Sequence, residues 1–155
     1  MKTFTFNGVR AGWVTARVGS QGDYQSFVGS YVLGDAIRDL ADNIASLGTI
    51  STATCRWFQE PEEIEWRFTR SDNSVKVTVL SCCERNAPPA QQLFEGVFEW
   101  PRFGADVLEA LLELRSTFGL PGYECEWRHP FPAEACQKLE ITVARASQSD
   151  STLYQ

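Results

Sequence analysis

Polar and apolar residues alternate along most of the N-terminal part of the chain, which is the pattern of strands that bury one face of a sheet. Short alternating runs flank Asn7-Gly8, a dipeptide that favours a two-residue turn, so a hairpin is predicted there. Further turns are predicted at 19–22 and 59–62, where glycine and proline interrupt the pattern. The alternation predicts strands at 13–18, 24–32, 49–58, 63–70, 75–79 and 93–100.

Two segments repeat apolar residues with the 3.6-residue period of a helix instead. The first begins at Asp35 and ends at Gly48, a residue type that commonly caps the C-terminus of a helix. The second covers about 105–118, where Gly119 ends it and Pro121 prevents its continuation. We therefore expect one helix in each half of the chain.

The second half of the chain repeats part of the pattern of the first, at an offset of 70 or 71 positions. The matching pairs are Asp35 and Asp106, Leu40 and Leu111, Gly48 and Gly119, Cys55 and Cys125, and Trp57 and Trp127. Because the order of the elements also matches, we interpret the similarity as an internal duplication. By this match, residues 123–128 are predicted to be a strand. Residues 64–70 match 139–145 at an offset of 75, so 139–146 is predicted to be a strand as well.

Together these patterns predict an α+β fold with a mainly antiparallel sheet of about eight strands and two helices, built from two ββαββ pseudo-repeats. The pseudo-repeats would cover 1–73 and 74–146. Because halves of roughly 70 residues are marginal as independent domains, both are expected to share one core in a single domain, 1–146. Residues 147–155 lack periodicity and are expected to form a flexible C-terminal tail.

Composition narrows the functional class without naming a reaction. The 155 residues include 43% hydrophobic side chains, as in a folded protein, and carry a formal net charge of -6. That charge repels a phosphate backbone, so a nucleic-acid partner is not expected. An acidic surface favours a basic protein partner instead.

Five cysteines, an odd number, argue against a disulfide scaffold. The chain starts with an alternating pattern and not with a basic and then apolar leader, and no apolar run reaches the roughly 20 residues that span a bilayer. The sequence therefore predicts a cytoplasmic protein without a membrane partner.

A cysteine-dependent enzyme is an alternative that the sequence does not favour. His129 is the only histidine, and no cysteine near it stands in a nucleophile signature. A metal site is also disfavoured, because adjacent residues Cys82 and Cys83 would point to opposite faces of a strand and only one of them could bind the ion. We expect Cys55 and Cys125 to be small buried residues, and we predict no metal and no cofactor.

Acidic residues gather at the turn between two predicted strands, around Pro61. Such a cluster repels itself, and a cationic partner would relieve that repulsion. Phe58 is expected to project beside these acids, on the side of Arg56, and exposed aromatics are common at binding hot spots. A merely solvated turn remains the alternative. The predicted partner-binding residues are Phe58, Glu60, Glu62, Glu63 and Glu65, with the acidic helix stripe Asp106, Glu109 and Glu113 as second choice.

In size, acidity, α+β composition and lack of a catalytic signature, the chain resembles the small acidic immunity proteins of bacterial contact-dependent and other polymorphic toxin systems. That resemblance implies a cytoplasmic, non-enzymatic inhibitor that binds a cognate, often basic, toxin domain and blocks its active site. A secretion chaperone or adaptor, which would bind an unfolded segment, is the alternative binding function.

Overall fold

Seven strands and three helices make up the computed structural model, which describes residues 1–152. The strands are β1 (Phe4–Arg10), β2 (Trp13–Ser20), β3 (Asp23–Ser30), β4 (Thr52–Phe58), β5 (Glu63–Ser71), β6 (Ser74–Cys82) and β7 (Gln91–Glu99). The helices are α1 (Ala36–Ser46), α2 (Arg102–Trp127) and α3 (Ala133–Thr152). The tail predicted at 147–155 lies partly outside the described residues; its first six residues, 147–152, belong to α3.

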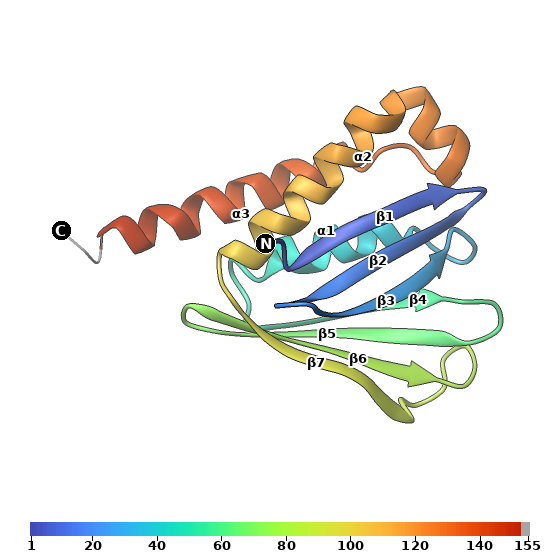
Figure 1. The fold of residues 1–155 in the computed structure, drawn as a ribbon, viewed down its shortest axis with the longest axis horizontal. Coiled ribbons are helices and arrows are strands. Elements are labelled where there is room, and N and C mark those ends of the chain that lie inside the picture. The colour runs from blue at the N-terminus through green and yellow to red at the C-terminus, as the bar shows by residue number, and fades with distance from the viewer. Residues whose placement is uncertain (153–155) are drawn as a thin grey trace.

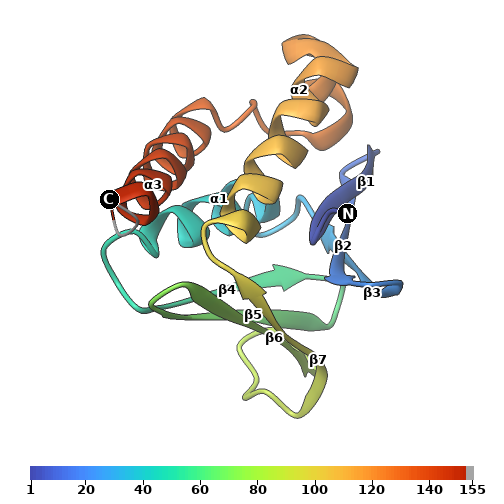
Figure 2. The ribbon, with the colours of Figure 1, turned by 60° about the vertical axis from the view of Figure 1, so that its left-hand side comes forward.

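The strands form two antiparallel sheets, one in the order β1-β2-β3 and one in the order β4-β5-β6-β7. Figure 1 shows β3 and β4 side by side and running in the same direction, with α1 connecting them. Across this seam the side chain of Gln59 donates a hydrogen bond to the carbonyl oxygen of Val28 at 3.0 Å. The three helices lie on one side of the strands (Figure 2). Both sheets and all three helices therefore contribute to one continuous core.

The α+β class is confirmed, but the prediction of eight strands and two helices in two ββαββ repeats is wrong. The segments 123–128 and 139–146, predicted to be strands, lie mainly within α2 and α3. In the first, Tyr123 and Trp127 are fully buried while Cys125 between them is exposed. A strand would place all three on one face, whereas residues four apart share a face of a helix. The second half thus does not repeat the ββαββ order of elements.

Gly119 does interrupt a helix, as the sequence predicts. Its backbone angles, φ 69° and ψ 166°, break α2 into two helical segments. The positive φ is readily adopted by glycine, and Pro121 is tolerated in the first turn of the segment that follows. The segment after this stop is not the predicted strand, because the chain turns at Gly119 and resumes a helix.

The predicted hairpin at Asn7-Gly8 is also displaced. Strand β1 runs through this dipeptide, and its register with β2 shifts between Phe6 and Gly8, which absorbs the irregularity as a bulge. The turn lies instead at Ala11-Gly12, where both residues have positive φ, 51° and 81°. A side chain at position 12 would collide with the ring of Tyr31, since an added Cβ would lie 2.2 Å from it.

Asp35 links the start of α1 to the end of α2. Its carboxylate accepts a hydrogen bond from the backbone N–H of Arg38 at 3.1 Å, which caps α1, and another from the indole Nε1 of Trp127 at 2.8 Å. Asp35 is 5% exposed and Trp127 is fully buried. The two bonds therefore satisfy polar groups that have no access to water.

Candidate functional site

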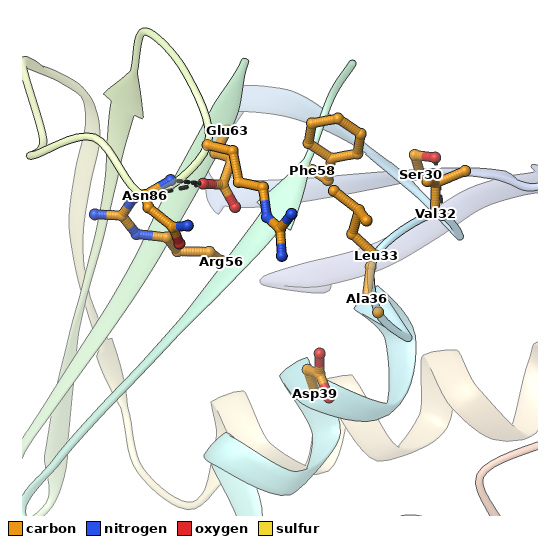
Figure 3. A pocket seen from close by; sticks show the side chains of 11 residues that line it. Ser30, Val32, Leu33, Ala36, Asp39, Arg56, Phe58, Glu63 and Asn86 are labelled. Carbon is orange, nitrogen blue, oxygen red and sulfur yellow. Dashed lines mark hydrogen bonds and ion pairs between the residues drawn. The ribbon is translucent and has the colours of Figure 1, made fainter. Parts of the chain in front are cut away.

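A cavity of about 220 Å³ lies where β3 and β4 end and α1 begins. Three parts of the chain line it: the β3–α1 connection with the start of α1, the β4–β5 hairpin, and the loop between β6 and β7. Figure 3 shows Leu33 and Phe58 on one side of this space and Arg56, Glu63 and Asn86 on the other, with Asp39 of α1 below them. We call this space the hairpin cleft.

Arg56 forms ion pairs with two carboxylates at the hairpin cleft. Its guanidinium lies 3.6 Å from the carboxylate of Glu63 and 3.1 Å from that of Glu65, which also pairs with Arg67. Glu63 additionally accepts a hydrogen bond from the backbone N–H of Asn86 at 2.6 Å, which holds the β6–β7 loop against the hairpin. Two of the acids in the predicted cluster are therefore already paired with arginines.

The register of the hairpin explains why Glu63 and Glu65 are paired with arginine, unlike the other acids of the predicted cluster. Phe58 lies opposite Glu63, and Arg56 lies opposite Glu65, so these four side chains share one face of the sheet. Opposite charges in directly facing positions attract each other. A four-residue turn at 59–62, which the sequence indicates, already implies this register, so the Arg56–Glu65 pair was within reach of sequence reasoning.

Glu60 and Glu62 remain at the tip of the hairpin, where both are exposed. The turn is closed by a hydrogen bond from the backbone N–H of Gln59 to the carbonyl oxygen of Glu62 at 2.7 Å. Glu60 accepts a hydrogen bond from the hydroxyl of Ser30 at 3.3 Å. Within the described part of the chain, neither carboxylate forms an ion pair. We define the hairpin tip surface as Phe58, Glu60 and Glu62.

Sequence reasoning missed most of the residues that line the hairpin cleft, among them Leu33, Asp39 and Arg85. Leu33 is 58% exposed and adopts a positive φ of 66°. Burial raises the pKa of the Asp39 carboxyl above its ordinary value, although Arg38, 3.8 Å away, opposes that effect. Arg85 comes from the β6–β7 loop and forms no ion pair with another described residue. Neither periodicity nor a motif marks these positions, because the fold alone brings them to the hairpin.

The second-choice acidic stripe on α2 is largely engaged within the molecule. Asp106 is buried and accepts hydrogen bonds from the backbone N–H and the hydroxyl of Thr3, at 2.8 and 2.7 Å. Lys2 lies 2.6 Å from Glu109 and 3.1 Å from Glu113. The stripe thus fastens the N-terminus to α2, and it offers less uncompensated charge than the hairpin tip surface.

No hydrogen bond joins a cysteine to His129 within the described residues. The Nε2 atom of His129 makes its hydrogen bond with the carbonyl oxygen of Tyr31, at 2.9 Å. Burial raises the pKa values of the Cys55, Cys82 and Cys136 thiols, which disfavours the reactive thiolate. For Cys55, nearby Asp39 and Glu65 add to that effect.

Thiol labelling tests this arrangement directly. In the folded protein near neutral pH, a thiol reagent should modify the exposed Cys83 and Cys125 quickly and the other three cysteines only after unfolding. Mass spectrometry of the labelled peptides, with and without denaturant, would show the difference. Fast native labelling of Cys82 or Cys136 would contradict this expectation and favour a cysteine-dependent enzyme.

Among the described residues, no group of three or more histidine, cysteine, aspartate or glutamate side chains is arranged to hold a metal ion. Within the same part of the chain, no helix has the length and apolar character needed to cross a membrane. Comparison of the chain with protein-family models, with curated proteins and with solved structures finds no match.

Proposed function

We propose that this protein is a non-enzymatic inhibitor that binds a basic protein partner through the hairpin tip surface, in the manner of the immunity proteins of bacterial toxin systems. The observation that carries the proposal is the pair of exposed carboxylates, Glu60 and Glu62, next to the half-buried ring of Phe58 and an open cleft. A partner side chain could enter the cleft while its neighbouring cations approach the two acids.

The internal ion pairs support this choice of surface over the others that the sequence offers. Glu63 and Glu65 are held by arginines, and Glu109 and Glu113 share Lys2, so binding a cation there would compete with existing pairs. Glu60 and Glu62 would lose no such pair. Phe58 and Leu33 add apolar area next to them, and aromatic residues beside a pocket are frequent anchors of protein interfaces.

The net charge of -6 favours the same type of partner. A basic toxin domain would be attracted over several ångströms before contact, which raises the association rate at low salt. Inhibition would follow if the bound protein covers the active site of the toxin. Within this proposal the protein acts in the cytoplasm of the cell that carries the toxin.

Charge reversal at the tip tests the proposal. The partner for the test is the toxin domain encoded by the neighbouring reading frame, with affinity measured by calorimetry at low and at physiological salt. Changing Glu60→Lys and Glu62→Lys together should weaken binding by about 10- to 100-fold, because like charges would then face each other across the interface. Phe58→Ala should weaken it separately.

A control variant keeps the same net charge but places the new lysines elsewhere. Glu124→Lys with Glu140→Lys changes two exposed acids on α2 and α3, and it should reduce affinity much less than the tip variant. Equal affinity of the tip variant and the unmodified protein would refute the proposed surface. A neighbouring frame that encodes no toxin would refute the immunity function, and salt-insensitive binding of an unfolded segment would identify a chaperone.

A further inference from the structure

Three of the four sheet edges lie beside another strand or helix within the described residues. Strand β1 packs beside α2, and in the turn that follows β1 the backbone N–H groups of Ala11 and Gly12 donate hydrogen bonds to Glu126 of α2. Strands β3 and β4 lie next to each other along the seam between the sheets. Strand β7 is the remaining edge, and its one strand partner is β6 (Figure 1). Within the described residues, no second strand pairs with the outer backbone N–H and C=O groups of β7.

Strand β7 has only part of the usual protection of an exposed edge. Natural proteins commonly place lysine or proline on such strands, or interrupt them with bulges. The nine residues of β7 include no lysine, arginine or proline. The register with β6 shifts once, near the start of β7, and is regular from Phe94 onwards. Val97 is 66% exposed, the second most exposed large apolar side chain of the described part after Met1.

The charge of this edge indicates what would bind to it. Glu95, Val97 and Glu99 alternate along the strand and project from the same face of the sheet. Lys76 lies 3.8 Å from Glu95, and Glu99 forms no ion pair with a described residue. A second copy of β7 would bring two more carboxylates to the same edge, where like charges facing each other are destabilising. A basic strand would complement the edge.

We propose that the edge of β7 binds an extended, basic segment of another protein as a fifth strand of the four-stranded sheet. Main-chain hydrogen bonds would provide most of the affinity, and lysine or arginine side chains of the segment would face Glu95 and Glu99 across Val97. This surface lies on the opposite edge of the sheet from β4 and is separate from the hairpin tip surface. It would therefore add a second contact to the proposed inhibitor.

A synthetic peptide provides the probe. It has nine residues, the length of β7, alternates lysine and valine, and has blocked termini. Added to the full-length protein, it should shift the amide resonances of β7 and slow their hydrogen exchange. The matched control is the same peptide with N-methyl groups on alternate residues, which removes the donors on one edge and should bind at least about 10-fold more weakly.

Protein variants separate strand addition from general attraction to an acidic surface. Glu95→Lys with Glu99→Lys should weaken peptide binding by at least about 10-fold. The variant Glu124→Lys with Glu140→Lys has the same net charge and should bind the peptide much more tightly than the β7 variant does. Equal affinity for the N-methylated and the unmodified peptide would overturn the proposal. Loss of peptide binding in Glu60→Lys with Glu62→Lys, but not in Glu95→Lys with Glu99→Lys, would overturn it as well. A dimer whose β7 amides are protected without peptide would assign the edge to a second copy and would overturn it too.

Discussion

Replacing Trp66 with alanine should lower the free energy of unfolding by about 3–5 kcal/mol, the range for large aromatic residues in a core. Trp66 is fully buried in the four-stranded sheet, and its ring contacts residues of both sheets. Its ring centroid lies 5.5 Å from that of Phe27 and 6.4 Å from that of Phe4, both in the three-stranded sheet. Within its own sheet it lies 5.2 Å from Trp57. The cavity left by alanine would loosen the packing between the sheets.

Urea unfolding followed by circular dichroism would measure this loss, with Trp66→Phe as the matched control. The indole Nε1 of Trp66 is buried without a hydrogen-bond partner in the described part of the chain, so phenylalanine removes no existing bond. It also retains most of the ring volume and should cost clearly less than alanine. A loss below about 1 kcal/mol for Trp66→Ala would show that this residue does not join the sheets.

Asp35→Ala should lower the free energy of unfolding by about 1.5–5 kcal/mol, because one substitution removes two functions of the same carboxylate. Loss of the cap on α1 accounts for about 0.5–2 kcal/mol. Leaving the buried indole N–H of Trp127 without an acceptor accounts for about 1–3 kcal/mol more. Thermal and urea unfolding of the variant would measure the sum.

Two further substitutions, Asp35→Asn and Trp127→Phe, separate the contribution of the α1 cap from that of the hydrogen bond to Trp127. Asp35→Asn keeps an oxygen that can accept both hydrogen bonds, so it should be milder than alanine. Trp127→Phe removes the donor, and in that background Asp35→Ala should cost only the cap, a coupling that a double-mutant cycle would measure. If Asp35→Ala costs the same in both backgrounds, the bond to Trp127 contributes nothing to stability.

Sequence patterns were most informative in the first hundred residues. Val14, Ala16 and Val18 of β2 are buried against the core, whereas Trp13 and Arg17 are exposed and Thr15 is half-buried. The same rule holds for Ile64, Trp66 and Phe68 in β5. A sheet with one buried face imposes a period of two on its sequence, so strands of this kind can be recognised locally.

The same rule failed after Gly119 because short alternating runs also fit a helix. Ile141 and Val143 alternate with polar residues and have β-branched side chains, which favours a strand. In the structure Leu139 is buried and Ile141 is 45% exposed, which follows the helical period of α3. Packing against α1 distinguishes the two patterns, because it buries one face of α3. Thr142 of α3 also donates a hydrogen bond to the carbonyl oxygen of Ala45 in α1 at 2.9 Å.

The candidate site was predictable from the sequence only where it depends on residues close together in the chain. The exposed position of Glu60 and Glu62 follows from a polar turn around Pro61 and needed no tertiary information. The pairing of Glu63 and Glu65 with Arg56 depends on the register across that turn. The other walls of the hairpin cleft, Leu33 and Asp39 among them, come from the connection that leads into α1. No local pattern places them there.

By itself, the sequence determined the positions of six strands, the first helix, the stop at Gly119 and the acidic, aromatic character of the hairpin, because each depends on residues close together in the chain. The tertiary structure alone decided that the chain is helical after Gly119, that Lys2 pairs with the acids of α2, and which sheet edge has no second strand partner. Those properties depend on partners far apart in sequence, such as Lys2 with Glu109 or β1 with α2, and a local pattern cannot contain them.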